Sequence, residues 1–286
     1  SLNKENYGEL IDTFNGIGDL NKGIIKTPTD SDKTFSDDPL RMLRAVRFST
    51  QLNYKIERNT FASIKRNLNR IEILSGERIS EELNKILMQD KPSNGFILLD
   101  KLNILKIILP ELESLKGIEE VEGQTHKDNF YHTLEVVDNI SSKTNNICLR
   151  WAALLHDIGK SSTKKFNKEI GWTFHGHEYV GSKMVKQIFT RLKLPLNDSM
   201  KYVQKIVMMS SRPVIIAEEI VTDSAVRRLI YDAGDSIDDL LTLCEADITT
   251  KNKRKFEQYH NNFKIVRQKI KKVEEKDNIR NFQPPV

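Results

Sequence analysis

The strongest constraint on the fold is a succession of segments in which apolar residues recur every three or four positions. This spacing lines one face of an α-helix, so each segment is predicted to be a helix that packs on its neighbours. The first helix is predicted to start after Ser36 to Asp38, where a capping side chain precedes Pro39. The chain is therefore predicted to be mainly α-helical. The later helices are predicted at residues 58–68, 77–89, 94–102, 130–142, 147–157, 177–192, 198–209, 223–233, 236–247 and 254–275.

The first 35 residues depart from this pattern. They contain Gly16, Gly18, Gly23 and Pro28, together with a short β-prone stretch from Gly23 to Thr27. Such residues break helices and favour turns and strands, so we expect the end of a mixed α/β unit here. The chain starts with SLNKENYGEL, without an initiator methionine or an apolar signal region. We therefore expect it to be the inside of a longer protein or a trimmed piece of one.

The composition is that of a globular protein rather than a disordered or fibrous one. Of 286 residues, 38% are hydrophobic and 30% are charged, and this length predicts about two compact units. Cys148 and Cys244 lie in apolar helical stretches, where buried reduced thiols are typical, so no disulfide framework is implied. No apolar run approaches the roughly 18 residues of a membrane span. We expect a cytoplasmic protein without a membrane partner.

Histidine and aspartate residues are distributed along the helical part as a metal site would require. His156 and Asp157 end the apolar run from Leu149 to Leu155, His132 lies upstream and Asp247 downstream. Imidazole nitrogens and carboxylate oxygens suit first-row divalent metals, which acidify water and polarise phosphoryl oxygens. Four helices could bring these groups together. For His156 and Asp157 alone, a surface pair or a satisfied hydrogen bond is the commoner explanation.

A second cluster lies on the helix predicted to begin at Pro39. Arg41, Arg44 and Arg47 recur every three residues and form a cationic stripe beside an apolar one. Asp38 stands three residues before Arg41, close enough for the two side chains to meet at the helix entrance. On the pattern alone, Asp38 could equally be a helix cap and the arginines a solvated face.

Positive charge is concentrated near the C-terminal end. From Lys251 to Lys272, nine Lys or Arg residues accompany one acid, Glu257, in a chain of net charge +5 and pI near 9.0. An apolar seam in the same segment predicts a helix with one packed and one basic face. The basic face is either an ordinary solvated surface or a contact for an RNA backbone. The seam consists of Phe256, Tyr259, Phe263, Val266, Ile270 and Val273.

Three segments carry a family resemblance. Residues 11–52, IDTFNGIGDLNKGIIKTPTDSDKTFSDDPLRMLRAVRFSTQL, resemble the head-to-neck junction of the bacterial tRNA nucleotidyltransferase and poly(A) polymerase family, whose class II enzymes add CCA or A to RNA ends. Residues 73–87, ILSGERISEELNKIL, look like a later neck motif of that family. The order His132, then His156 and Asp157, then Asp247 resembles the signature of the HD phosphohydrolase superfamily, which forms the body of many bacterial members.

The resemblance implies a base-reading site in the neck. In that family an acidic-Asp-x-x-Arg element holds the incoming base, and the matching residues here are Asp37, Asp38 and Arg41. A carboxylate accepts from an exocyclic amine and a guanidinium donates to ring acceptors, which favours C and A. The implied partners are therefore CTP, ATP and the 3′ end of tRNA or another RNA. Arg44 is expected to serve the phosphates or the neck interior, and the base readers are expected to be braced by Glu77, Arg78 and Glu82.

The resemblance also implies a domain order and a second reaction. We expect the end of a nucleotidyltransferase head at 1–35, a helical neck that binds the base and RNA at 36–105, an HD domain at 106–250 and a basic helical start of a tail at 251–286. His132, His156, Asp157 and Asp247 match the HD metal ligands, Lys160 is placed to meet a phosphate, and His175 and His177 are additional metal-site candidates. A divalent ion such as Mg, Mn or Ni is implied. The expected activity is hydrolysis of phosphomonoesters or cyclic phosphodiesters at RNA ends.

One departure from the family pattern concerns the polymerising chemistry. Paired aspartates after a Gly-Ser loop should hold the catalytic Mg²⁺, but residues 1–35 contain neither these nor the Arg-Arg-Asp motif of the family. The chain as given is expected not to transfer nucleotides, although the longer protein is expected to. Whether that protein adds CCA, A or CC is left open. The alternatives are a free-standing HD phosphohydrolase, or a helical RNA-binding scaffold with a silent metal site.

Overall fold

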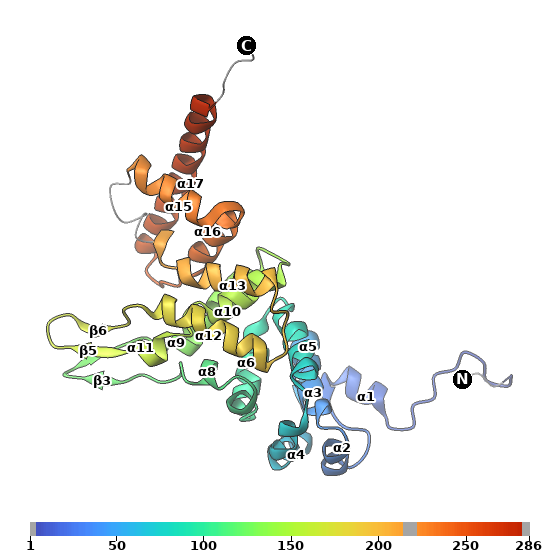
Figure 1. Cartoon of the computed structure of the whole chain (residues 1–286). Helices are drawn as coiled ribbons and strands as arrows, with labels where there is room; N and C mark the ends of the chain where they lie inside the picture. The colour runs from blue at the N-terminus through green and yellow to red at the C-terminus, as the bar shows by residue number, and fades with distance from the viewer. Residues whose placement is uncertain (1–3, 214–221, 282–286) are drawn as a thin grey trace. The chain divides into compact units, whose positions relative to one another are not determined.

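The computed structural model describes residues 4–213 and 222–281, with side chains described to residue 277. It divides into two compact units, Ser1–Ile108 (unit 1) and Leu109–Val286 (unit 2), both built mainly of helices (Figure 1). The predicted mainly α-helical fold is confirmed. No helix within the described ranges is both long and apolar enough to cross a membrane.

Unit 1 packs its helices around α3 (Leu40–Leu52). The face of α3 that carries Met42, Leu43 and Val46 is fully buried and contacts α5 and α6. A two-residue parallel pairing, Ile24 with Lys55 and Ile25 with Ile56, ties the N-terminal part to the end of α3. The remaining elements are α1 (Gly16–Asn21), β1 (Ile24–Ile25), α2 (Ser31–Asp37), β2 (Lys55–Ile56), α4 (Arg58–Arg66), the 3-10 helix η1 (Leu68–Ile73), α5 (Gly76–Leu87), α6 (Pro92–Lys101) and α7 (Leu105–Ile108).

Unit 2 is a helical body with two short antiparallel hairpins. The apolar α10 (Ile147–Leu155) packs against α9 and α13, and its residues 149–155 are all buried. The hairpin β5–β6 pairs Phe166 with Trp172. The other elements are α8 (Pro110–Glu113), β3 (Glu120–Val121), β4 (Gln124–Thr125), α9 (Asn129–Ser141), α11 (Lys160–Thr163), β5 (Lys165–Asn167), β6 (Gly171–Thr173), α12 (His177–Arg191), α13 (Asp198–Met209), α15 (Asp223–Ala233), the 3-10 helix η2 (Gly234–Ser236), α16 (Ile237–Ala246) and α17 (Lys253–Asn281).

The predicted helices all occur, with ends within two residues except at the last, which continues to Asn281. The helix predicted to begin at Pro39 starts at Leu40 as α3, but residues 31–37 form a further helix, α2, which was not predicted and is capped by Asp30 through the amide of Lys33. The segment after the His156-Asp157 pair forms α11 and β5, which were not predicted. Cys148 and Cys244 are free thiols as expected, although only Cys244 is fully buried. The end of the predicted basic tail, residues 282–286, lies outside the described residues.

Candidate functional site

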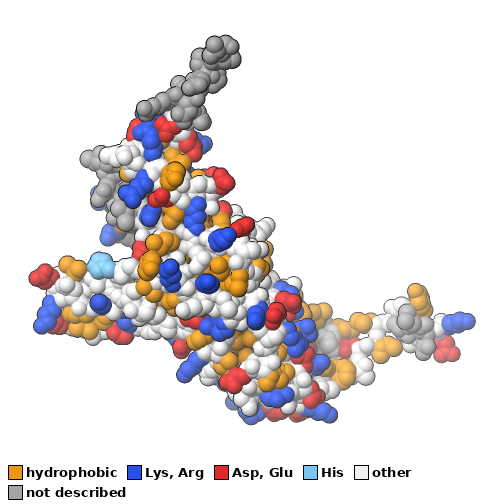
Figure 2. Space-filling model, viewed as in Figure 1, with side chains coloured by type: hydrophobic (Ala, Val, Ile, Leu, Met, Phe, Trp, Pro, Cys, Tyr) orange, Lys and Arg blue, Asp and Glu red, His pale blue; other side chains and the backbone are white. Residues whose placement is uncertain are grey.

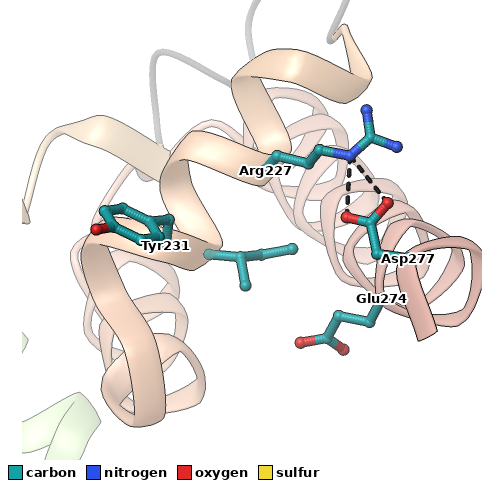
Figure 3. Close-up of a pocket in the computed structure, with 5 residues that line it drawn as sticks. Arg227, Tyr231, Glu274 and Asp277 are labelled. Carbon is teal, nitrogen blue, oxygen red and sulfur yellow. Dashed lines mark hydrogen bonds and ion pairs between the residues drawn. The ribbon is translucent and has the colours of Figure 1, made fainter. Parts of the chain in front are cut away.

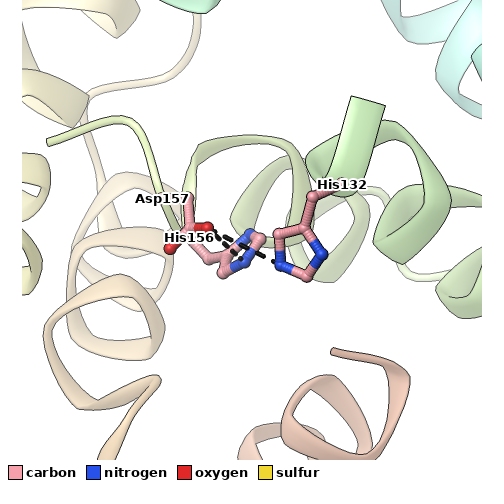
Figure 4. Close-up of side chains that lie close together, drawn as sticks. All are labelled: His132, His156 and Asp157. Atoms are coloured by element: carbon pink, nitrogen blue, oxygen red, sulfur yellow. Dashed lines mark ion pairs between the residues drawn. The ribbon is translucent and has the colours of Figure 1, made fainter. Parts of the chain in front are cut away.

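Three helices of unit 2 position the predicted metal-binding side chains. His132 lies in the second turn of α9, whose first turn is capped by Asp128 through the amides of Phe130 and Tyr131. His156 and Asp157 follow the last residue of the buried α10, and Asp247 follows α16. Each group therefore sits at or near a helix end, and Figure 4 shows the side chains of His132, His156 and Asp157 converging.

The ligand atoms of His132, His156 and Asp157 all lie within 4.8 Å of one another. Asp157 Oδ2 is 3.7 Å from His132 Nε2 and 3.4 Å from His156 Nε2. Asp247 joins the cluster, since its Oδ1 lies 2.8 Å from His132 Nε2 and 3.5 Å from His156 Nε2. The structure thus brings together four residues that are up to 115 positions apart in the sequence.

The orientation of both rings suits a metal ion. His156 Nδ1 is hydrogen-bonded to the carbonyl of Ala153 at 2.8 Å, and His132 Nδ1 lies 3.0 Å from Thr249 Oγ1. These contacts hold each Nε2 toward the cluster, as outer hydrogen bonds do for metal-ligating histidines. Within the described parts of the chain, His156 Nε2 and Asp247 Oδ1 are buried and make no hydrogen bond. Buried polar atoms are rarely left unsatisfied, so the donor set fits a divalent cation.

The two carboxylates change the protonation of the buried imidazole. Burial alone lowers the pKa of His156, but the charges of Asp157 and Asp247 outweigh it and raise this pKa to about 9. Burial would raise the pKa of Asp157, yet His156 and Lys160 hold it below its usual value. For Asp247 the effect of burial is likewise exceeded by His132 and His156, and its pKa is well below the usual value. The cluster therefore attracts positive charge, and a proton and a metal ion compete for His156 Nε2.

The remaining candidates lie at different distances from the cluster. Lys160 Nζ donates to Asp157 Oδ2 at 2.7 Å, so this amine sits beside the cluster. His177 Nε2 lies 3.6 Å from Asp157 Oδ1, while its Nδ1 contacts the carbonyl of Phe174 at 2.9 Å. His175 is exposed, and the structure does not place it with the other ligands. Of the His-x-His pair, only His177 faces the cluster.

Sequence reasoning missed the residues that orient the ligands. Thr249 contacts His132. The only feature of the sequence that could have indicated this is its position, two residues after Asp247. Glu178 accepts from the hydroxyl of Ser211 and lies 3.4 Å from His177 Nδ1 through its other oxygen. No pattern in the sequence indicated that these side chains would meet.

In unit 1, Asp38 lies at the junction of α2 and α3 and is held by two arginines. Arg41 Nε is 3.5 Å from Asp38 Oδ2, and Arg78 Nη2 donates to Asp38 Oδ1 at 3.3 Å. Both arginine side chains are about half exposed, at 53% and 48%. The exposed Asp37 is adjacent. Asp38, Arg41 and Arg78 therefore hold one another in place and remain accessible to a polar ligand.

Glu82 does not brace this pair but forms a separate centre with the α3 arginines. Its carboxylate is 2.6 Å from Arg47 Nε, 3.1 Å from Lys85 Nζ and 3.8 Å from Arg44 Nε. The side chain of Arg44 is 47% exposed, and its expected role at the phosphates or in the neck interior stays a prediction. Glu77 is exposed in the first turn of α5. Arg78, of the later motif, contacts Asp38.

The C-terminal helix α17 packs by its predicted seam. Phe263, Val266, Ile270 and Val273 are buried, whereas Phe256 is 39% exposed and does not belong to the packed face. Part of the positive charge is neutralised within unit 2, because Arg267 pairs with Glu245 at 2.7 Å and Asp238 at 3.2 Å. Basic and acidic side chains are interspersed over this part of the surface (Figure 2).

A surface depression between α15 and α17 is also mixed in charge. Arg227 Nε lies 2.9 Å from Asp277 Oδ2, beside Glu274 and the exposed ring of Tyr231 (Figure 3). Among the described residues that line this depression, the one cation is Arg227, which is already paired. The exposed basic residues of the segment lie both where α17 begins, at Lys251 and residues 253–255, and further along the helix, at Lys264, Lys271 and Lys272.

Two family models match the chain. Residues 53–116 match the family described as the probable RNA and SrmB-binding site of polymerase A, and residues 129–252 match the HD domain. The second range contains all four residues of the metal-binding cluster.

Curated relatives have a common activity in their names. The A-adding tRNA nucleotidyltransferase of Deinococcus radiodurans is 31% identical over 246 residues, which cover 83% of this chain and 55% of that protein. The multifunctional CCA protein of Shewanella frigidimarina is 28% identical over 271 residues, covering 90% of this chain and 62% of that protein. The chain therefore spans less than two thirds of the length of either relative.

Solved structures agree on the fold. The Thermotoga maritima CCA-adding enzyme complexed with tRNA has a TM-score of 0.61 at 19% identity, covering 94% of this chain and 57% of that one. A CCA-adding enzyme in complex with ATP has a TM-score of 0.61 at 19% identity, covering 94% and 55%. The helical architecture of both units is thus one that occurs in CCA-adding enzymes.

Proposed function

Since the chain belongs to the tRNA nucleotidyltransferase family, we propose that it supplies the base-selecting neck and an HD domain to an enzyme that adds nucleotides to the 3′ end of tRNA. The observation that supports this role is the triangle of Asp38, Arg41 and Arg78, in which one carboxylate is held between two half-exposed guanidinium groups. ATP and CTP are the proposed nucleotides, and a tRNA substrate would place the protein in the cytoplasm.

The triangle provides complementary hydrogen-bonding groups for a base. The carboxylate of Asp38 can accept from the exocyclic amine that C and A share, while Arg41 can donate to the ring nitrogen or carbonyl beside it. Arg78, in α5, donates to Asp38 Oδ1, the carboxylate oxygen that Arg41 does not contact, and so holds Asp38 in place. Guanine and uracil present a carbonyl where C and A present the amine, so Asp38 would be left facing an acceptor and would disfavour them.

Nucleotide incorporation by the full-length gene product tests this proposal, because the reaction also needs the catalytic head. Arg41→Ala is expected to reduce the preference for C and A over G and U by roughly tenfold or more, the effect of losing a hydrogen bond to a charged group. Arg58→Ala, at the first turn of α4, is the matched control. An Arg41→Ala enzyme with the wild-type preference among all four nucleotides would contradict base reading by this residue.

We propose in addition that unit 2 is a metal-dependent phosphohydrolase, because the unsatisfied buried atoms of His156 and Asp247 favour an occupied cation site. His132, His156, Asp157 and Asp247 would hold Mg, Mn or Ni. A bound divalent ion would polarise a phosphoryl oxygen and acidify a water molecule. Lys160, already 2.7 Å from Asp157, would bind a substrate phosphate oxygen, and His177 would orient Asp157 from the other oxygen.

Hydrolysis of p-nitrophenyl phosphate and its bis-ester by the purified chain, with each metal in turn, tests this activity. His156→Ala and Asp157→Ala should each abolish hydrolysis, since each removes a buried ligand. His260→Ala, on α17 outside the cluster, is the matched control. Equal rates in the wild type and in both cluster variants would show that the observed hydrolysis does not come from this site.

A further inference from the structure

A depression of about 310 Å³ adjoins the metal-binding cluster of unit 2. It is formed by the entrance of α9 and by the residues that follow Asp247, and His132 belongs to both the depression and the cluster. His132 Nε2 faces Asp157 and Asp247, whereas its Nδ1 contacts Thr249, which lines the depression. A substrate whose phosphate lies at the cluster would therefore have the next part of its structure beside this depression.

The charged groups of the depression favour an anion once their partners are considered. Lys127 and Lys251, one from each segment, are both exposed. Of the two lining acids, Asp128 is already engaged, because it accepts from the amides of Phe130, Tyr131 and Gly117 at 3.0 to 3.2 Å. Glu135 is the remaining lining acid, and the two lysines outnumber it.

The uncharged groups of the depression add two features typical of single-stranded RNA sites. The ring of Tyr131 is 50% exposed and offers a face on which a base can stack. The hydroxyl of Thr250 can donate to a phosphate oxygen or to a ribose hydroxyl. An aromatic ring beside two lysines matches a nucleotide with its phosphodiester better than it matches a carboxylate or an isolated phosphate.

We infer that this depression binds the penultimate nucleotide, the one before the terminal nucleotide that carries the reacting phosphate, so that the HD site acts on the phosphorylated end of an RNA strand in preference to mononucleotides. Lys127 and Lys251 contact the phosphodiester, and Tyr131 stacks on the preceding base. This inference rests on the proposed phosphohydrolase function, and it specifies the substrate class of that site.

Two measurements on the whole chain test the inference. The first is photo-crosslinking, in buffer containing a chelator, of a diribonucleotide with a 3′-terminal phosphate whose first base is 4-thiouracil. Crosslinks should map to residues 127–135 or 249–251. The second, with metal present, is the ratio of kcat/KM for this diribonucleotide to kcat/KM for the corresponding mononucleotide.

Matched pairs of variants show which side chains determine the ratio of kcat/KM values in the second measurement. Lys251→Glu should lower the ratio by about fivefold, whereas Lys186→Glu, an equal charge change at an exposed position of α12, should not. Tyr131→Leu should lower the ratio by about fivefold or more, and Tyr131→Phe, which keeps the ring, should not.

The possible outcomes separate this inference from the phosphohydrolase proposal. Hydrolysis of both substrates with ratios unchanged in Lys251→Glu and Tyr131→Leu, or crosslinks confined to other segments, would overturn the subsite while leaving the phosphohydrolase intact. Crosslinks in the depression without hydrolysis of either substrate would support the subsite and refute the hydrolytic function. Crosslinks in the depression together with the expected fall in ratio would support both.

Discussion

Glu82 of α5 is a buried acid that three cations surround. Its side chain is 2% exposed and lies near Arg44 and Arg47 of α3 as well as Lys85 of its own helix. A buried carboxylate is costly to desolvate unless opposite charges and hydrogen bonds compensate it, and here Arg47 approaches to 2.6 Å. Through this residue α5 is fixed against the helix that carries Arg41, the proposed base reader.

Removing this acid is expected to destabilise unit 1. Glu82→Ala should lower the free energy of unfolding by about 3 kcal/mol, since it leaves the mostly buried Arg47 without its charge partner. Arg47 keeps its contacts with Gln51 and with the ring of Phe48, which limits the loss. Urea unfolding followed by far-UV circular dichroism measures the change. Glu81→Ala, the exposed neighbour, should alter stability by less than about 0.5 kcal/mol. Equal unfolding midpoints for the two variants would contradict a stabilising role for Glu82.

At the scale of helices and strands, the sequence was sufficient wherever an element buries an apolar face. The limits of α13 and α15 were predicted to the residue because their apolar positions and capping residues coincide. The helix α2 was missed, since only Thr34 and Phe35 of its seven residues are buried and no helical period can be recognised. The hairpins were missed because their strands have two or three residues and are stabilised by contacts between segments, such as Trp172 Nε1 with the carbonyl of Gln124.

The residues of the candidate sites also differ in how far the sequence could predict their positions. That His132, His156, Asp157 and Asp247 would lie together could be predicted from their order, through the resemblance to the HD signature. The contact between Arg78 and Asp38, forty positions apart, was expected only from the family resemblance, because nothing local in the sequence indicates it. Geometry was likewise needed to separate His177 from the exposed His175.

The contact between the turn after α10 and helix α12 depends on one glycine. A Cβ at Gly159 would lie 2.2 Å from the carbonyl oxygen of His177 and 2.7 Å from the amide nitrogen of Gly181. Both are backbone atoms, so no side-chain rotation can relieve the clash. Gly159 therefore permits the close approach that places His177 beside Asp157.

Gly159→Ala is expected to push α12 away and to destabilise unit 2 by about 1 to 3 kcal/mol, the usual cost of overpacking. Urea unfolding followed by the fluorescence of Trp151, in the adjacent α10, measures this change. Gly181→Ala is the control, because its Cβ would meet two side-chain methyls at 3.3 Å and the backbone nitrogen of Gly159 at 3.4 Å, far less close than the contacts at Gly159, and the helix gains about 1 kcal/mol in propensity. A Gly159→Ala protein as stable as Gly181→Ala would show that the close approach is not needed.

Across the whole molecule, the two proposed chemistries reside in different units. The triangle of Asp38, Arg41 and Arg78, proposed to read the base, lies within Ser1–Ile108, and the cluster proposed to bind a metal lies within Leu109–Val286. Both tryptophans of the chain, Trp151 and Trp172, belong to the second unit. Tryptophan fluorescence therefore reports on the unit with the HD domain, which allows metal binding to be detected without any catalytic assay.

A divalent metal should stabilise this unit by mass action, because the converging ligands exist only in the folded state. At a metal concentration about 100-fold above Kd, the free energy of unfolding should rise by about 2.7 kcal/mol, measured by urea unfolding with tryptophan fluorescence. A chelator should reverse the effect. His156→Ala should lose the increase, because it removes a buried ligand atom, Nε2, that makes no hydrogen bond in the described chain. Asp38→Ala, which removes a carboxylate from the other unit, should keep it. A similar increase in wild type and His156→Ala would place the bound metal elsewhere, and the converging side chains would then be a buried ion-pair cluster rather than a metal site.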